Sequence, residues 1–185
     1  MELLRQLPGS VLWLRAGAPE ARRNLERTAE EQGVAASRLV FAAAVDSIEA
    51  HLARHRLANL FLDTLPYNGH TTACDALWAG LPVLTCSGRS FASRVGESVL
   101  KAVGLHELVT HSLEAYAQSA LALARDPSRL GSITQRLAEN RATSPLFNTA
   151  QYCRHLETAF AQMRERQRAG RSPAHFKVDS CIPCH

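Results

Sequence analysis

Two hydroxyl side chains and a carboxylate follow a short apolar run in the middle of the chain. Thr71 and Thr72 stand where a loop passes into a helix, and Asp75 comes about one helical turn later. The first turn of a helix has free backbone N–H groups and the positive end of the helix dipole, so with two hydroxyl groups it suits a phosphate or diphosphate. A carboxylate one turn further suits ribose hydroxyls. The same spacing also fits an ordinary strand–loop–helix unit in which a threonine caps the helix.

The elements that must position these groups are a strand, a loop, a helix and a second strand. An apolar run predicts a buried parallel strand over 59–63, and Pro, Asn and Gly residues predict a loop over 64–69. A helix over 70–79 ends at Gly80, and a strand follows over 82–85. The loop therefore lies at the carboxyl end of a parallel strand, where open α/β sheets hold their ligands.

Strands alternate with helices along the rest of the chain as well. This alternation predicts an α/β fold, Rossmann-like, with a parallel sheet and right-handed crossovers. Further strands are predicted over 11–14, 39–42 and 106–110, and helices over 1–8, 19–33, 47–56, 91–103, 113–125, 127–142 and 149–169. The last helix has an apolar stripe of a kind typical of core packing, formed by Tyr152, Leu156, Ala159, Phe160 and Met163.

Length and composition narrow the class of protein. The chain has 185 residues and a net charge of +4, which fits one globular domain. Its arginines are scattered along helices without interleaved aromatic residues, which argues against a nucleic-acid partner. No apolar run is long enough for a membrane span, which argues against a membrane partner. The five cysteines are irregularly spaced and no signal peptide is visible, so we expect a cytoplasmic protein without structural disulfides.

The chain ends in Cys181-Ile-Pro-Cys-His185, which spells the attachment pattern of c-type haem. No export signal and no haem-pocket sequence accompany it. We therefore interpret residues 171–185 as a flexible tail, or as read-through after a frameshift. An adventitious metal or redox pair formed by Cys181, Cys184 and His185 is the second interpretation.

The segment from Leu62 to Thr85 resembles the signature of the protein O-linked N-acetylglucosaminyltransferases (O-GlcNAc transferases) and the related SPINDLY proteins. Residues 92–95 and 144–149 resemble two further motifs of that family, in the same order, and the similarity runs almost end to end. The resemblance implies that residues 1–170 are most of the C-terminal half of a GT-B glycosyltransferase, the half that binds the nucleotide sugar. It also implies that the first strand of this domain lies upstream of Met1.

The resemblance further implies a binding site for the UDP part of the donor. The matching residues are His51 and Arg54 at the uracil base, His70, Thr71 and Thr72 at the diphosphate, and Asp75 at the ribose. His51 and Arg54 share one face of the predicted helix over 47–56, which would otherwise be an ordinary surface helix. A family lysine near the ribose falls at Ile48 here, which leaves that contact to Asp75 alone.

Two other motifs receive a weaker functional interpretation. Ser90, Ala92, Ser93 and Arg94 open the helix over 91–103 and are expected to border the same crevice, although a helix cap followed by a surface arginine explains them equally well. In the segment 144–149, Pro145 is expected to end one helix and Thr149 to cap the next.

The implied activity is the inverting, metal-independent transfer of GlcNAc from UDP-GlcNAc to Ser or Thr hydroxyl groups of proteins, with no cofactor. No Asp-x-Asp metal motif accompanies the predicted site. The catalytic residues and the protein-acceptor site belong, in the family, to an N-terminal half outside this chain, so no catalytic residue is named here. The alternatives are a non-catalytic UDP- or UDP-sugar-binding fragment or pseudoenzyme, and an O-fucosyltransferase-like relative that uses a GDP-sugar.

The strand expected upstream of Met1 would be central in the usual strand order 3-2-1-4-5-6. We therefore expect the chain by itself to be poorly stable. We also expect it to transfer no sugar, because neither an acceptor site nor a group that takes the hydroxyl proton can be named in it. Either a partner chain completes the sheet, or the strands over 11–14 and 59–63 pair directly.

Overall fold

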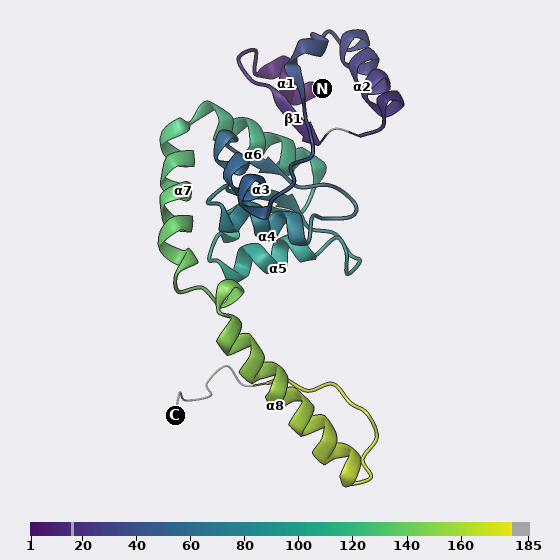
Figure 1. Ribbon diagram of the computed structural model, residues 1–185, viewed down its shortest axis with the longest axis vertical. Coiled ribbons are helices and arrows are strands. Elements are labelled where there is room, and N and C mark those ends of the chain that lie inside the picture. Colours follow the sequence, from purple (N-terminus) through teal and green to yellow (C-terminus); the bar gives the residue numbers. More distant parts are fainter. Residues whose placement is uncertain (16, 179–185) are drawn as a thin grey trace.

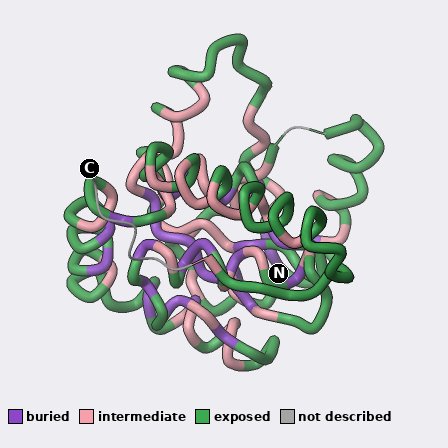
Figure 2. The backbone as a smooth tube through the Cα atoms, turned by 90° about the horizontal axis from the view of Figure 1, so that it is seen from below, coloured by how far each residue is buried: buried purple, intermediate pink, exposed green. Residues whose placement is uncertain are grey.

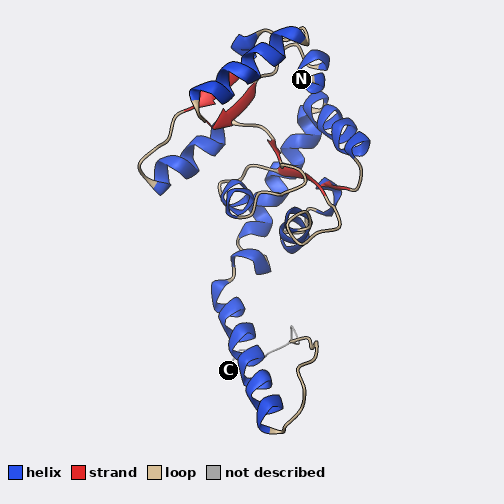
Figure 3. Cartoon of the chain, turned by 90° about the vertical axis from the view of Figure 1, so that its right-hand side faces the viewer, coloured by secondary structure: helices blue, strands red, loops and turns tan. Residues whose placement is uncertain are grey.

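The computed structural model describes residues 1–15 and 17–178, and its strands form two small parallel sheets among helices (Figures 1 and 3). Strand β1 (Leu12–Arg15) pairs with β2 (Leu39–Ala42), with Leu12 opposite Leu39. Strands β3 (Phe61–Leu62), β4 (Val83–Cys86) and β5 (Val109–Thr110) form the second sheet in that order. Every pair is parallel, as the predicted alternation of strands and helices requires.

Helices occupy the predicted segments, and local signals fix their ends. Ser47 and Ser112 cap two of them by accepting from the backbone N–H three residues later, at 3.1 Å in each case. Gly80 has φ +88° and follows the end of another, as predicted. The α-helices are α1 (Glu2–Gln6), α2 (Pro19–Glu31), α3 (Ile48–Arg54), α4 (Thr71–Trp78), α5 (Val95–Ala102), α6 (Leu113–Arg125), α7 (Pro127–Arg141) and α8 (Thr149–Arg168). Short 3-10 turns, η1 to η4, span Ala36–Arg38, His55–Leu57, His106–Leu108 and Pro145–Phe147.

Some of the predicted helix starts are wrong. Helix α5 begins at Val95 rather than 91, because Ser90 and Ser93 bond to each other in a turn of their own. The cap of α8 is Asn148, whose side-chain oxygen accepts from the N–H of Gln151 at 2.9 Å, and not Thr149.

The apolar stripe on α8 does not pack in the core. Figure 1 shows α8 projecting away from the rest of the protein. Tyr152 is 64% exposed, Phe160 58% and Met163 50%. The interpretation of this stripe as core packing is therefore wrong. None of the helices in the described ranges is both long enough and apolar enough to cross a bilayer. Cys181, Cys184 and His185 lie outside the described residues.

The larger of two apolar cores surrounds β4, all four of whose residues are buried. Figure 2 shows that the buried segments gather in the middle of the protein. Helices on both sides contribute Leu77, Leu100, Leu123 and Leu137, each at most 2% exposed. A smaller cluster packs around β2 and consists of Leu4, Ala29, Val34 and Leu39. Because burial of a leucine or valine contributes about 1.5–3 kcal/mol, the larger core carries most of the hydrophobic stabilisation.

The two sheets do not join. Among the described strands, β1 pairs only with β2 and β3 only with β4, so the anticipated direct pairing of 11–14 with 59–63 is not formed. The orders β2-β1 and β3-β4-β5 reproduce the usual doubly wound order with its first strand left out. Each sheet therefore keeps an open edge at β1 or β3, and open edges invite pairing with another strand.

We predict that the two sheets of the isolated chain open separately. Amide hydrogens of β1 and β2 should exchange about tenfold or more faster than those of β4, because only the small cluster holds them. Leu39→Ala should lower protection in β1 and β2 alone, and Leu84→Ala should lower it in β3, β4 and β5 alone, each at a cost of about 2–5 kcal/mol. Native-state hydrogen exchange measures the protection of each strand amide. If both sheets were equally protected and lost protection together in either variant, the prediction of separate opening would be wrong.

Candidate functional site

Two loops lie side by side at the carboxyl ends of β3 and β4. The first runs over 63–70 and leads into α4, and the second runs over 87–94 and leads into α5. The backbone N–H of Asn68 in the first loop donates to the carbonyl of Ala92 in the second, at 3.0 Å. Because β3 and β4 are parallel neighbours, both loops and the starts of both helices meet at one edge of the sheet.

The first turn of α4 presents unoccupied donors at this edge. His70 is the N-cap residue, and its side chain makes no capping hydrogen bond to the helix. The plain interpretation in which a threonine caps the helix is therefore wrong. Thr71 and Thr72 are exposed on the first turn. A helix start without a side-chain cap keeps its first N–H groups for solvent or for a ligand.

His70 is held between two aromatic rings. It stacks on Tyr67, with ring centroids 4.9 Å apart and an angle of 17° between the planes, and meets the edge of Phe91 at 6.1 Å. Its Nε2 atom is buried and has no hydrogen-bond partner among the described residues. Such an atom is costly unless a group outside the chain satisfies it. Tyr67 and Phe91 themselves are 64% and 75% exposed.

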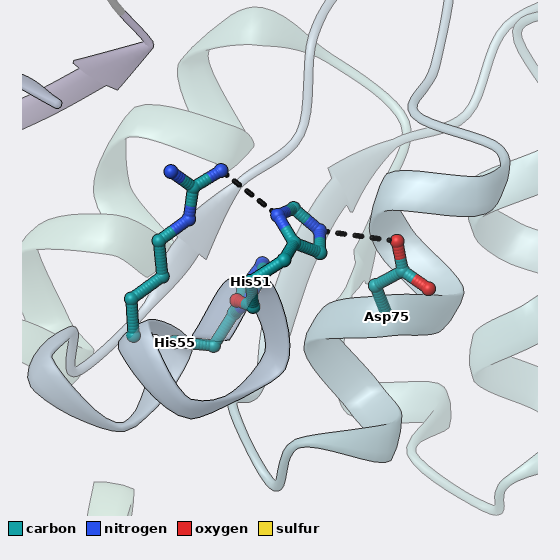
Figure 4. Close-up of polar contacts among 4 residues, drawn as sticks. His51, His55 and Asp75 are labelled. Carbon is teal, nitrogen blue, oxygen red and sulfur yellow. Dashed lines mark hydrogen bonds and ion pairs between the residues drawn. The ribbon is translucent and has the colours of Figure 1, made fainter. Parts of the chain in front are cut away.

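A chain of three polar side chains joins α3 to α4 (Figure 4). His51 Nε2 lies 3.3 Å from Asp75 Oδ2, and Arg54 Nη2 lies 2.8 Å from His51 Nδ1. An arginine can only donate, so Nδ1 of His51 accepts and its Nε2 carries the proton that points to Asp75. The imidazole is thus fixed by both of its nitrogens as a neutral Nε2–H ring.

Two more contacts fix the same helix. Arg54 Nη1 donates to the carbonyl of Ala43 at 3.0 Å, just beyond the end of β2. His55 Nδ1 donates to the carbonyl of His51 at 2.8 Å, and the two imidazole rings meet edge to face at 4.8 Å. Arg54 therefore links the carboxyl end of the smaller sheet to the polar chain on α4. His51 and Asp75 both remain 24% exposed, within reach of a ligand.

The cysteine beside Asp75 is not prepared for nucleophilic chemistry. Burial raises the pKa of the Cys74 thiol, and the negative charge of Asp75 raises it further. The reactive form of cysteine is the thiolate, and a raised pKa keeps the thiol protonated at neutral pH. Cys74, Cys86 and Cys153 are all free cysteines.

Asp63, which the sequence marked only as the end of a strand, is a buried centre of the site. It is 3% exposed and accepts hydrogen bonds from the N–H of Thr64, the N–H of Gly69 and the hydroxyl of Thr85. Its carbonyl accepts from the hydroxyl of Tyr116 at 3.0 Å. Burial raises the pKa of Tyr116, and the charge of Asp63 adds to this, so the phenol stays a donor. The signal in the sequence was a carboxylate between a buried strand and a loop containing glycine.

The structure brings the six predicted UDP-binding residues onto two neighbouring helices. Hydrogen bonds join His51, Arg54 and Asp75, while His70, Thr71 and Thr72 begin the helix that carries Asp75. The weaker candidates on the second loop are less available. Ser93 is 4% exposed and bonded within the loop, and Arg94 is the N-cap residue of α5 without a side-chain cap bond. Ile48, at the position of the family's lysine, is 57% exposed.

An open groove of about 680 Å³ lies elsewhere, at the amino ends of β3 and β4. It runs between η2 and α7, and Arg56, Pro82 and Leu130 are among its lining residues. None of the six predicted residues lines it. The carboxyl ends of parallel strands are the usual place for a ligand, so the groove does not compete with the site on α3 and α4.

No group of three or more His, Cys, Asp or Glu side chains within the described residues is arranged to hold a metal ion. The expectation that the chemistry needs no metal stays a prediction, because a cation can also be held by the substrate.

A family model and two curated relatives all match this chain to the same kind of glycosyltransferase. Residues 1–156 match the model of glycosyl transferase family 41. A UDP-N-acetylglucosamine–peptide N-acetylglucosaminyltransferase of Caenorhabditis elegans is 35% identical over 99% of this chain and 16% of its own length. The Arabidopsis thaliana protein SEC, named as a probable enzyme of the same kind, is 36% identical over 95% of this chain and 18% of its own length.

A solved structure agrees with these relatives. A mutant O-GlcNAc transferase of Thermobaculum terrenum is 34% identical, with a TM-score of 0.81, and the match covers 88% of this chain and 32% of that one. The predicted resemblance and the Rossmann-like α/β fold class are thereby confirmed. The chain spans less than a fifth of the two curated relatives' length.

We predict that Arg54 and Asp75 together determine the tautomer of His51. In Arg54→Met the donor to Nδ1 is gone and only Asp75 still favours Nε2–H, so a fraction of the Nδ1–H form should appear, whereas the parent chain should show Nε2–H alone. Nitrogen-15 NMR of the histidine side chains distinguishes the two forms. Arg56→Met, on an exposed neighbouring residue, is the matched control and should leave His51 unchanged. An unaltered Nε2–H tautomer in Arg54→Met would contradict the assignment.

Proposed function

Because the chain belongs to glycosyl transferase family 41, we propose that it forms the donor-binding part of a protein O-GlcNAc transferase. Such an enzyme moves GlcNAc from UDP-GlcNAc to Ser or Thr hydroxyl groups of proteins. The two curated relatives described above are named for UDP-N-acetylglucosamine as the donor and a peptide as the acceptor. Those names favour UDP-GlcNAc over a GDP-sugar. The acceptor site, the catalytic groups and a cytoplasmic location are part of the same proposal.

The observation that carries the proposal is the way the six predicted residues divide into two groups on adjacent helices. The uncapped first turn of α4 supplies N–H groups together with the hydroxyl groups of Thr71 and Thr72, which suits a diphosphate. One turn further along the same helix, Asp75 and the neutral His51 suit a ribose and a base. The unpartnered Nε2 of His70 supports a ligand at the diphosphate end.

Arg54 takes a second role in this proposal besides the base contact that the family resemblance implies. Both of its terminal nitrogens already donate, one to His51 and one to the carbonyl of Ala43. Three of its five N–H groups remain for a direct contact with the base. Arg54 also supports base binding through the fixed imidazole of His51, and a direct base contact stays a prediction.

The site would assist the reaction by stabilising the leaving group. When the bond between the anomeric carbon and the β-phosphate oxygen breaks, negative charge collects on that phosphate. Preorganised N–H and hydroxyl donors at the start of α4 oppose this charge without a metal ion. The acceptor oxygen forms the new bond with inversion, and its proton passes to a base that the proposal places outside these 185 residues.

We expect calorimetry on the chain to show UDP binding that depends on α4. Thr72→Ala and Asp75→Ala should each raise the dissociation constant about tenfold or more, because each hydrogen bond to a charged group is worth about 1.5–3 kcal/mol. Thr134→Ala, on an exposed residue of α7 at the opposite groove, is the matched control and should change nothing. Unaltered UDP affinity in the Thr72/Asp75 double variant would rule out the site, and preference for GDP would reassign the nucleotide.

UDP binding should also survive the removal of divalent cations. The donors at the start of α4 already supply positive potential to the diphosphate. Titrations in EDTA, in magnesium and in manganese should give the same dissociation constant. Loss of binding in EDTA, with recovery on adding either metal, would show that a cation belongs to the site.

A further inference from the structure

The carboxylate of Asp63 is enclosed, and its hydrogen bonds reach three separate parts of the chain. Oδ1 accepts from the N–H of Thr64 at 2.9 Å and from the N–H of Gly69 at 2.6 Å. Oδ2 accepts from the hydroxyl of Thr85 on β4 at 2.6 Å. A buried carboxylate is tolerated only when its oxygens are satisfied in this way, so the geometry of its partners is strongly constrained.

The backbone at Gly69 and Gly96 packs closely against the Asp63 carboxylate and its hydrogen-bond partners. A Cβ atom added to Gly96, in the first turn of α5, would lie 2.5 Å from Asp63 Oδ2. A Cβ atom on Gly69 would lie 2.7 Å from Thr72 Oγ1 and 3.3 Å from Asp63 Oδ1. Both helix starts therefore pack directly against the carboxylate and its partners. The positive ends of the two helices also favour a negative charge at this point.

Asn68 closes the same loop from its other side. It is 1% exposed, its side-chain N–H donates to the carbonyl of Thr64 at 3.0 Å, and its side-chain oxygen accepts from the N–H of Gly96 at 3.2 Å. The loop over 63–70 is thus tied to β4 by Asp63 and to α5 by Asn68. Gly69, whose N–H donates to Asp63 Oδ1 at 2.6 Å, immediately precedes His70 and the first turn of α4.

We propose that Asp63 is the positioning residue of the donor diphosphate site, acting through Gly69 and not by contact with the ligand. The proposal rests on the proposed function of the first turn of α4. By holding Gly69, the carboxylate sets where His70, Thr71 and Thr72 stand relative to the diphosphate. The nucleoside end of the site is held separately, by Asp75 and α3. Loss of Asp63 should therefore weaken phosphate recognition and spare the nucleoside.

The test compares UDP with uridine, which lacks the diphosphate, by calorimetry or ligand-detected NMR on the full chain. In Asp63→Asn one carboxylate oxygen becomes an NH2 group and the other loses its charge, which weakens the bond from the N–H of Gly69, so UDP affinity should fall about tenfold or more while uridine affinity stays within about twofold. Thr110→Val is the matched control. It removes a buried hydroxyl that donates to the carbonyl of Thr85 in the same sheet, away from the loop, and should keep the ratio of the two affinities.

A second pair of variants covers the case in which Asp63→Asn does not fold. Thr85→Val removes the donor to Oδ2 and should lower UDP affinity selectively, whereas Thr85→Ser keeps the hydroxyl and should restore it. A parent chain that binds no UDP would end the proposed function and this inference with it. A parent chain whose UDP binding is weakened by Thr72→Ala but not by Asp63→Asn or Thr85→Val would overturn the inference alone. If the variants lost affinity for UDP and for uridine equally, the role of Asp63 would be structural only.

Discussion

A charge buried at the carboxyl end of a strand has to be surrounded by donors, and in this protein that requirement shapes the loop before α4. Asp63 obtains one donor from its own neighbour, one from across the sheet at Thr85 and one from Gly69. The last of these bends the chain back to the sheet just before the helix starts. The carboxylate of Asp63 thus fixes the position of the helix start that faces the candidate ligand, and the ligand need not contact Asp63 itself.

The second half of the site depends on an element from the other sheet. Helix α3 follows β2, which belongs to the smaller sheet, yet its His51 bonds to Asp75 on α4 of the larger one. Arg54 connects the two elements, because it donates one hydrogen bond to the carbonyl of Ala43, just beyond β2, and another to the imidazole of His51. Because no described strand pairs across the two sheets, contacts of this kind help to hold the proposed base site and the proposed phosphate site in position relative to each other.

Most of the fold could be predicted because its boundaries carry strong local signals. Gly80 and Pro82 mark the turn between α4 and β4, and serines at 47 and 112 begin two helices. The roles of His51 and Arg54 could be suggested only by the family resemblance, since nothing local separates α3 from an ordinary surface helix. The part played by Asp63 was missed because its partner on β4 lies 22 residues away. For α8, periodicity showed which face is apolar but not whether anything covers it.

The central claim is that a nucleoside diphosphate binds across the first turn of α4 and the Asp75–His51 pair. The most direct test is to titrate nitrogen-15-labelled chain with UDP and to map the amide signals that move. The account predicts shifts concentrated in residues 69–75 and in α3, with the Nε2 signal of His51 perturbed. Shifts gathered instead around the groove lined by Arg56 and Leu130, or the absence of any shift at saturating UDP, would contradict it.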